Sequence, residues 1–185
     1  LYAYWKSTSF TVTYNYYGGI APEGSVGNAR LIFGEHYTLE IPVPSDATLV
    51  FGGWYQEPGG QGNRYTDELG NSLAVWNTAN DDTTVYAYWI EALAFRESTN
   101  GAYAVLKGPD INQVKNLIIP VSYNGRPVSY IDSGAFSGCS SLVTVEIPDT
   151  IAQVGATGAT PFNECGNLEE INIYHVEGNN LIVYS

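Results

Sequence analysis

The stretch that decides the fold of the C-terminal half is Ile131-Asp132-Ser133-Gly134-Ala135-Phe136-Ser137-Gly138-Cys139-Ser140-Ser141-Leu142, which leads into Val145-Glu146-Ile147-Pro148. A second copy is Phe162-Asn163-Glu164-Cys165-Gly166-Asn167-Leu168, which leads into Ile171-Asn172-Ile173, so that the two copies align at one constant offset. An earlier copy of the short apolar segment, at a similar offset, is Leu117-Ile118-Ile119-Pro120. Aliphatic residues that recur at a period of roughly 20–30 residues are typical of a solenoid, whose stacked repeats bury their apolar side chains against one another.

Alternation along the repeated strands predicts which side chains point into such a solenoid and which point out. The inward set is Leu142, Val145, Ile147, Leu168, Ile171 and Ile173, with Phe136 and Phe162 on the return side. The outward set, which we take as the candidate ligand-binding face, is Asn116, Ile118, Thr144, Glu146, Glu170, Asn172 and Tyr174. The alternative for this face is a plain solvated surface. Residues 176–185 are expected to begin another repeat.

The N-terminal half contains a longer repeat. Leu1-Tyr2-Ala3-Tyr4-Trp5 recurs further along the chain as Val85-Tyr86-Ala87-Tyr88-Trp89. We therefore expect residues 1–6 to be the end of a preceding repeat, residues 7–91 to be one complete unit, and residues 92–185 to be the stacked repeats. Strands are expected at 10–14, around a turn within 31–41, at 49–55 and at 84–89, because these segments are rich in β-branched and aromatic residues between turn signals. The glycines within Leu49–Tyr55 predict a bulge or a close backbone approach.

The landmarks of the first unit resemble the Listeria–Bacteroides repeat, also called the internalin B-type repeat. The resemblance lies in Phe51-Gly52-Gly53-Trp54-Tyr55 and in the closing Val85-Tyr86-Ala87-Tyr88-Trp89. It implies a small β-grasp-like domain that occurs in tandem on bacterial surface proteins. This unit is longer than the family pattern in the region of residues 59–76.

The second unit resembles the BspA-like leucine-rich repeats of bacterial surface proteins, on the strength of Ile131 to Cys139. About two and a half repeats are present, and the second copy is degenerate, with Pro161 in place of alanine. The overall expectation is a mainly β chain, a β-grasp-like repeat followed by a short leucine-rich solenoid.

Composition limits the classes of partner. The chain has 185 residues, with seven Lys and Arg against 19 Asp and Glu, a formal net charge of -12. Such a charge disfavours nucleic acid and anionic membrane surfaces. No apolar run has the length of a transmembrane helix, so no membrane insertion of this segment is expected. The hydrophobic share of 44% is sufficient for packed cores.

Catalytic and metal motifs are missing from the sequence. His36 and His175 are the only histidines, and no familiar spacing joins either to a nucleophile or to metal ligands. Cys139 and Cys165 occupy equivalent repeat positions and are expected as buried free thiols, with a disulfide as the alternative. Trp54, Trp76 and Trp89 are expected in the core, with a sugar-stacking platform as the alternative. We therefore predict no enzyme, no cofactor and no metal.

These observations favour a non-catalytic segment of an extracellular bacterial adhesin, exposed on the cell surface or secreted. Its partner is expected to be a host extracellular or cell-surface protein, or a glycan. The alternative is a carbohydrate-binding module of a secreted enzyme.

Overall fold

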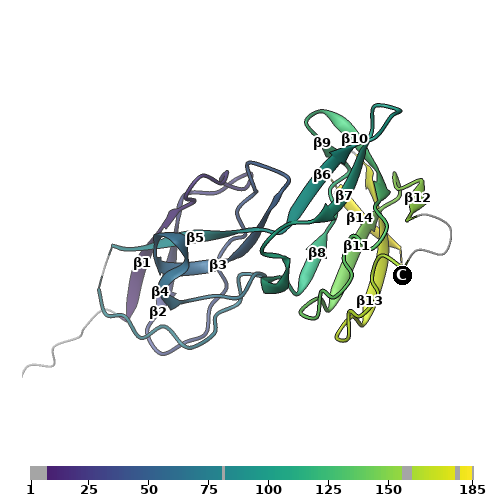
Figure 1. Cartoon of the computed structure of the whole chain (residues 1–185). Coiled ribbons are helices and arrows are strands. Elements are labelled where there is room, and N and C mark those ends of the chain that lie inside the picture. Colours follow the sequence, from purple (N-terminus) through teal and green to yellow (C-terminus); the bar gives the residue numbers. More distant parts are fainter. Residues whose placement is uncertain (1–7, 81, 156–159, 178–179, 185) are drawn as a thin grey trace, which may run out of the picture. The chain divides into compact units, whose positions relative to one another are not determined.

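The computed structural model describes residues 8–80, 82–155, 160–177 and 180–184; of residues 177 and 180–184 it describes the backbone alone. The fold is mainly β, as the sequence predicts. The chain forms two compact units (Figure 1), and each is described by itself below. The first comprises the described residues of Leu1–Ser45 and Phe51–Trp89, and the second those of Asp46–Val50 and Ile90–Ser185. The prediction for residues 1–6 lies outside the described residues.

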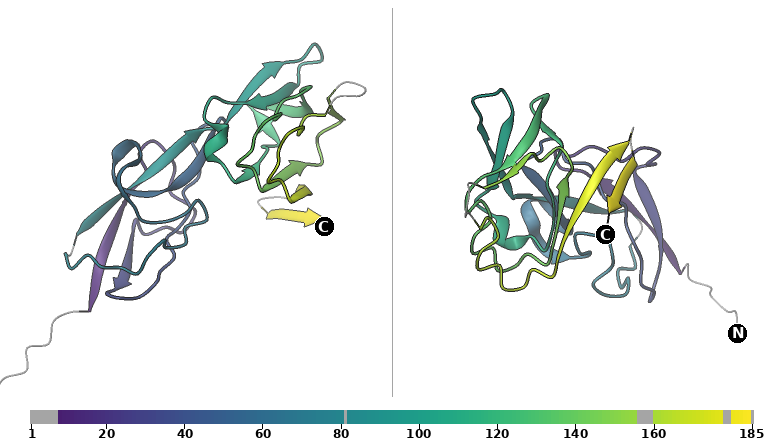
Figure 2. Two further views of the ribbon diagram at one scale, coloured as in Figure 1. Left: turned by 60° about the horizontal axis from the view of Figure 1, so that its bottom comes forward. Right: turned by 90° about the vertical axis from the view of Figure 1, so that its right-hand side faces the viewer.

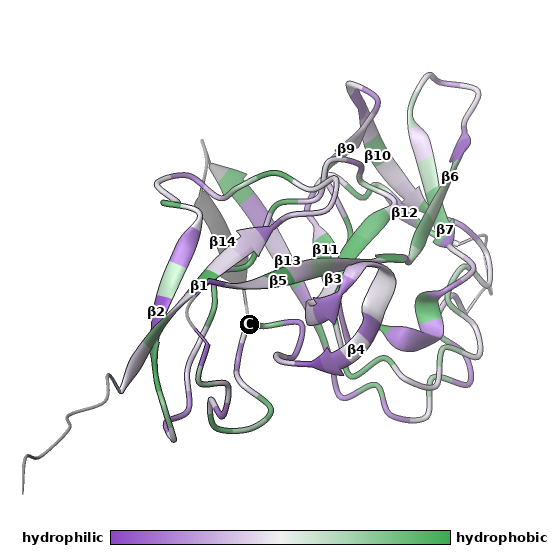
Figure 3. Ribbon diagram, turned by 90° about the vertical axis from the view of Figure 1, so that its left-hand side faces the viewer, coloured by the Kyte–Doolittle hydropathy of each residue, from purple (hydrophilic) through white to green (hydrophobic). Residues whose placement is uncertain are grey.

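The first unit is built on one five-stranded mixed sheet. Its strand order is β2-β1-β5-β3-β4, and β1 pairs with β2 in antiparallel and with β5 in parallel. The bounds are Ser9–Asn15 for β1, Asn28–Ile32 for β2, Leu49–Glu57 for β3, Gln61–Arg64 for β4 and Thr83–Glu91 for β5. A 3-10 turn, Pro58–Gly60, joins β3 to β4. β4 is hydrophilic along its length, and all its residues are exposed (Figure 3).

The predicted strands of this unit are present with one exception. Tyr37 to Ile41 is not a strand and contributes only an isolated bridge between Thr38 and Asn71. The carboxylate of Glu40 in this segment accepts hydrogen bonds from the hydroxyls of Tyr16 and Ser25, at 2.6 and 2.7 Å. Backbone hydrogen bonds from Leu39 to Gly70 and from Ser72 to Tyr37, together with these side-chain bonds, hold the segment in place of a strand pairing.

The core of the first unit is aromatic. Phe10, Val12 and Tyr14 alternate inward along β1, as predicted, and the ring of Tyr14 stacks on Trp54 at 4.8 Å. Trp54 and Trp76 are fully buried, which confirms their predicted place in the core.

Gly53 is the point of closest backbone approach in β3. Its φ is 112°, and an added Cβ would lie 2.5 Å from the carbonyl oxygen of Thr66. The close approach predicted for this glycine segment is therefore confirmed, and no L-residue with a side chain fits there without strain.

The second unit contains a ladder of parallel strands. β8, β11 and β13 pair in register, Val145 with Leu117 and with Ile171. Successive copies of the short apolar segment thus lie directly beside one another, as the alignment of the repeats predicts. The strands are Asn116–Ile118 for β8, Thr144–Pro148 for β11 and Glu170–Glu177 for β13; a 3-10 turn, Ile111–Gln113, precedes β8.

A second sheet in this unit has the order β12-β10-β7-β6, and β9 pairs with β10. β6 and β7 form an antiparallel hairpin, whereas β10 pairs in parallel with both β7 and β12. The bounds are Leu93–Glu97 for β6, Tyr103–Lys107 for β7, Ser122–Tyr123 for β9, Arg126–Ile131 for β10 and Gln153–Val154 for β12. The core of the unit includes Leu117, Val128, Phe136 and Leu142, all with no exposed surface.

The expectation of a further repeat over residues 176–185 is wrong. β13 continues to Glu177, and β14, Asn180–Tyr184, turns back and pairs with it in antiparallel (Figures 1 and 2). A parallel return needs a crossover of roughly a dozen residues. Only residues 178 and 179 separate the two strands, so their connection allows a hairpin and no further parallel rung.

Candidate functional site

The parallel ladder brings most of the predicted ligand-binding face together. Because the strands are in register, Thr144 lies between Asn116 and Glu170, and Glu146 lies between Ile118 and Asn172. We call these six residues the outer strip: Asn116, Ile118, Thr144, Glu146, Glu170 and Asn172. The hydroxyl of Thr144 donates a hydrogen bond of 2.8 Å to the side-chain oxygen of Asn116. The strip therefore consists of two cross-strand rows.

Exposure varies along the outer strip. Ile118 is 51% exposed and Glu170 is also exposed, whereas Asn116, Thr144, Glu146 and Asn172 are half-buried. One carboxylate oxygen of Glu146 is buried and has no hydrogen-bond partner among the described residues. A buried carboxylate oxygen without a partner is costly. Glu146 thus combines a half-buried side chain with one carboxylate oxygen that is left unpaired within the described structure.

The predicted exposure of Tyr174 is wrong. Its side chain is 2% exposed, and its hydroxyl donates a hydrogen bond of 2.5 Å to the carbonyl of Ile119. Burial raises the pKa of Tyr174 to about 12, and the charges of Glu146 and Asp149 add to this. Tyr174 is thus a structural residue beneath the surface and is not part of the outer strip.

Two residues of the predicted inward set are exposed. Leu142, Val145 and Ile147 are buried as expected. Ile171 and Ile173, which pair in register with Val145 and Ile147, are 48% and 43% exposed. In-register partners share a face of the sheet. The face is therefore the predicted one, but the apolar layer is covered over β11 and only partly covered over β13.

The described tryptophans do not form an exposed platform. Besides the buried Trp54 and Trp76, Trp89 is half-buried, and its indole N–H donates to the carbonyl of Tyr16 at 2.9 Å. The indole of Trp54 likewise donates to the carbonyl of Glu40. Rings that are buried and bonded in this way are not available for sugar stacking.

The two cysteines are not bonded to each other, and the two histidines contact different side chains. Cys139 and Cys165 are free thiols; Cys139 is buried as predicted, and Cys165 is half-buried. Burial raises the pKa of Cys139, and the neighbouring Cys165 adds to the shift. His36 contacts the hydroxyl of Ser72 at 2.9 Å, and His175 contacts Asp149 at 2.5 Å. Within the described ranges, no three His, Cys, Asp or Glu side chains are grouped so as to hold a metal ion.

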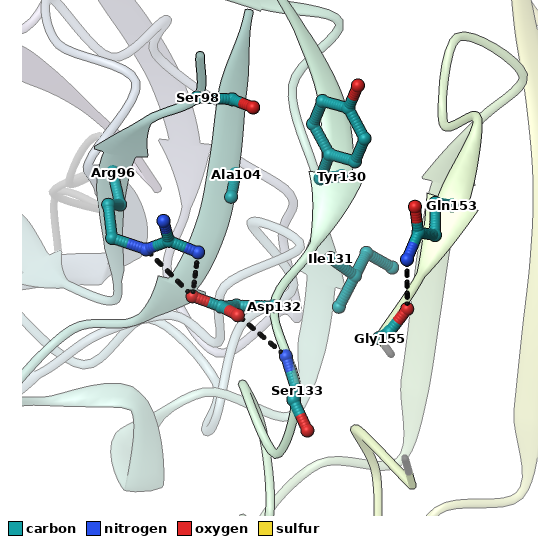
Figure 4. Close-up of a pocket in the computed structure, with 9 residues that line it drawn as sticks. All are labelled: Arg96, Ser98, Ala104, Tyr130, Ile131, Asp132, Ser133, Gln153 and Gly155. Carbon is teal, nitrogen blue, oxygen red and sulfur yellow. Dashed lines mark hydrogen bonds and ion pairs between the residues drawn. The ribbon is translucent and has the colours of Figure 1, made fainter. Parts of the chain in front are cut away.

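The structure reveals a second polar site that the sequence did not indicate. A cavity of about 180 Å³ lies on the β6-β7-β10-β12 sheet (Figure 4). Arg96 pairs with Ala104 across the strands, Ala104 with Tyr130, and Tyr130 with Gln153. We call the cavity the polar cup and define it by Arg96, Ser98, Ala104, Tyr130, Asp132 and Gln153.

An ion pair closes one end of the polar cup. The Nε and Nη2 atoms of Arg96 donate to one carboxylate oxygen of Asp132, at 3.0 and 2.7 Å. These hydrogen bonds lower the pKa of Asp132 below its usual value. Asp132 belongs to the decisive repeat stretch, but its partner is 36 residues away in the β6–β7 hairpin. No repeat signal points to that hairpin.

The described residues include no helix with the length and apolar character of a membrane-crossing segment. No protein-family model matches the chain. No curated protein matches it either.

Two solved structures resemble part of the chain. One is a leucine-rich repeat protein of T. pallidum, 22% identical over 43% of this chain and 35% of that protein, with a TM-score of 0.38. The other is a leucine-rich cell surface protein of Faecalibacterium prausnitzii, 27% identical over 43% of this chain and 19% of that protein, with a TM-score of 0.33. The chain thus spans well under two thirds of either protein.

Proposed function

We propose that this chain is a non-catalytic segment of a bacterial cell-surface or secreted adhesin. Residues 7–91 act as a β-grasp-like Listeria–Bacteroides repeat in a stalk, and the stacked repeats within residues 92–185 form a leucine-rich solenoid. The outer strip is its ligand-binding face, and the partner is a host or neighbouring-cell surface protein or glycan. The motif resemblances support the surface setting, and the parallel ladder supports the binding face.

The single observation that carries this proposal is the register of β8, β11 and β13. It aligns side chains from three separate segments of the chain, all of them polar except Ile118, into two continuous rows. Repeat proteins commonly bind their partners on such extended surfaces. A partner that contacts several strands can make favourable contacts with both rows at once.

The charge of the outer strip indicates the chemistry of the partner surface. Glu146 and Glu170 lie in adjacent rows, in a chain of formal net charge -12. A complementary partner presents Lys or Arg side chains, which steer association towards the two carboxylates of the strip. Association should therefore weaken as ionic strength rises.

The test is a screen of the purified chain against immobilised matrix proteins and a glycan array at physiological salt. For each saturable hit, binding is compared with that of the double variant Glu146→Gln/Glu170→Gln. We expect the dissociation constant to rise by about tenfold or more, because charged contacts at an interface contribute about 1–3 kcal/mol each.

The matched control is Glu23→Gln/Glu57→Gln, which removes the same charge from two exposed positions of the first unit. Equal weakening by both double variants would show that net charge alone drives binding and would overturn the outer strip as the site. If nothing binds saturably, the adhesive role of this segment is overturned, and its role as part of a stalk remains.

The alternative, a carbohydrate-binding module that stacks sugars on its tryptophans, has no support in the described structure. Trp54 and Trp76 are buried, and the indole N–H of Trp89 donates a hydrogen bond to the backbone carbonyl of Tyr16.

A further inference from the structure

The polar cup owes its shape to a small residue between large ones. Arg96 on β6 and Tyr130 on β10 flank Ala104 on β7, whose side chain ends at its Cβ (Figure 4). Ala104 is 3% exposed and forms the floor. Because the neighbouring side chains rise on both sides, the row leaves a hollow over the middle strand.

The walls of the cup are fixed by bonds within the protein. Arg96 is held by Asp132, and the amide of Asn100 donates to the hydroxyl of Tyr130 at 2.6 Å. The amide of Gln153 donates to the carbonyl of Gly155 at 2.7 Å. A ligand therefore meets polar groups that are already oriented, which lowers the entropic cost of binding.

These bonds leave hydrogen-bonding capacity on residues that line the cavity. The hydroxyl of Tyr130 accepts from Asn100 and keeps its own hydrogen to donate. The side-chain oxygen of Gln153 is an acceptor, and the Ser98 hydroxyl is both donor and acceptor. The side chain of Arg96 is 61% exposed. Its guanidinium has five N–H groups, and the structure shows two of them donating to Asp132. The cup thus offers donors and acceptors in a mixed arrangement.

The charge and size of the cup favour a neutral, compact ligand. Arg96 is neutralised by Asp132, so an anion would meet a carboxylate that is 25% exposed at the same wall. The volume of about 180 Å³ is below the roughly 300–1,000 Å³ of sites for drug-sized ligands. It equals about six water molecules at ~30 Å³ each, which suits a single sugar ring.

A hexose ring matches these features in its chemistry. Each hydroxyl is both a donor and an acceptor, and its C–H face packs on an aromatic ring such as Tyr130. We infer that the polar cup is a binding site for one neutral hexose unit, seated over Ala104 between Arg96 and Tyr130, with Gln153 lining the cup beyond Tyr130. This site lies on a different sheet from the outer strip and does not depend on the proposed function of that strip.

The experiment is an NMR titration of the isotope-labelled chain with glucose, galactose, mannose, N-acetylglucosamine and, for contrast, glucuronic acid. We expect saturable shifts of the Ala104 amide, the Arg96 Nε–H and the Gln153 side-chain amide with at least one neutral sugar. For a ligand of about a dozen heavy atoms the dissociation constant should be on the order of millimolar. Glucuronic acid should bind more weakly because of Asp132.

Two variants and one control make the assignment specific. Ala104→Leu fills the hollow and should abolish the shifts. Since Ala104 is buried, the exposed Gln153→Ala provides a second variant that leaves the core intact, and it should raise the dissociation constant by about fivefold or more. Asn112→Ala, exposed and outside the cup, should change nothing.

The inference is overturned if no neutral sugar causes saturable shifts, if glucuronic acid alone binds, or if Gln153→Ala and Asn112→Ala bind alike. Glu146→Gln/Glu170→Gln should leave hexose binding unchanged, and Gln153→Ala should leave binding to the outer strip unchanged. A negative result for hexose binding at the polar cup would therefore leave the proposal for the outer strip standing, and the reverse holds as well.

Discussion

The hydroxyl of Tyr174 on β13 donates a hydrogen bond to the backbone carbonyl of Ile119, which follows β8 and lies 55 residues earlier in the chain. Tyr174 is itself paired with Pro148 of β11, so this one side chain ties the third strand of the ladder to the first. The amide of Ile119 is bonded to the carbonyl of Glu146 on β11. Both polar groups of the Ile119 backbone are therefore satisfied by later repeats.

Replacing Tyr174 by Phe should destabilise the second unit by about 1–3 kcal/mol, because a buried carbonyl loses its donor while the ring still fills its place. The measurement is urea unfolding followed by far-UV circular dichroism. All four tryptophans lie within residues 1–89. Tryptophan fluorescence therefore follows the first unit and should keep its midpoint in this variant. Tyr17→Phe, at a side chain that is 53% exposed, is the control and should cost little.

Gly53→Ala should destabilise the first unit by more than about 1 kcal/mol, since the new Cβ meets the Thr66 carbonyl at 2.5 Å and the φ of 112° disfavours any side chain. Gly18→Ala separates these two causes. Gly18 also has a positive φ, 91°, but its added Cβ would meet open space. Tryptophan-detected urea unfolding measures both. Equal losses would mean that backbone conformation accounts for the whole effect and that the close approach to Thr66 adds nothing.

The two thiols should differ in reactivity. Cys165 is half-buried, whereas Cys139 is buried and its pKa is raised, so a thiol-reactive dye should label Cys165 first. Cys139 should react only when the second unit opens. Cys165→Ser should remove the fast phase and leave the slow one. If the unreduced, denatured chain shows no reactive thiol, the cysteines form a disulfide and the free-thiol assignment is wrong.

Alkaline pH should destabilise both units. Burial is the main cause that raises the pKa values of Tyr14, Tyr37 and Tyr174 to about 12. A tyrosine in the unfolded chain has a pKa of about 10. The unfolded state then loses its protons first, so the stabilising contribution is complete below about pH 10 and is lost as the pH rises towards 12.

The check is urea unfolding at several pH values, together with the near-ultraviolet absorbance of phenolate. In the second unit, Tyr174→Phe should flatten the pH dependence, while the first unit, which retains Tyr14 and Tyr37, should keep it. An unfolding free energy that stays constant from pH 10 to 12 would show that these phenols titrate in the folded chain as they do in water.

The sequence predicts the strands best where a repeat fixes the register. Val145 and Ile171, equivalent positions of two successive repeats, are paired in the ladder, and the alternation of Phe10 and Val12 gives the buried face of β1. Alternation assigns a residue to one side of a sheet, but it does not say what covers that side. This is why Tyr174 was expected on the surface, although it is buried.

The polar cup could not be predicted in the same way. Arg96 and Asp132 are brought together by the β6–β7 hairpin, which has no counterpart in the repeats. The segment from Tyr37 to Ile41 shows the same limit. Its strand-like composition yields only an isolated bridge, between Thr38 and Asn71.

The antiparallel turn of β14 onto β13 has a consequence for self-association. A parallel ladder exposes unpaired backbone groups along its last strand, and such an edge is a template for pairing with another chain. From Ile173 to Glu177, β14 occupies that edge of β13 (Figure 2). A strand from a neighbouring molecule would have to displace β14 before it could add to the ladder there. The hairpin thus reserves this part of β13 for pairing within the chain, and the edge of the sheet on this side becomes β14.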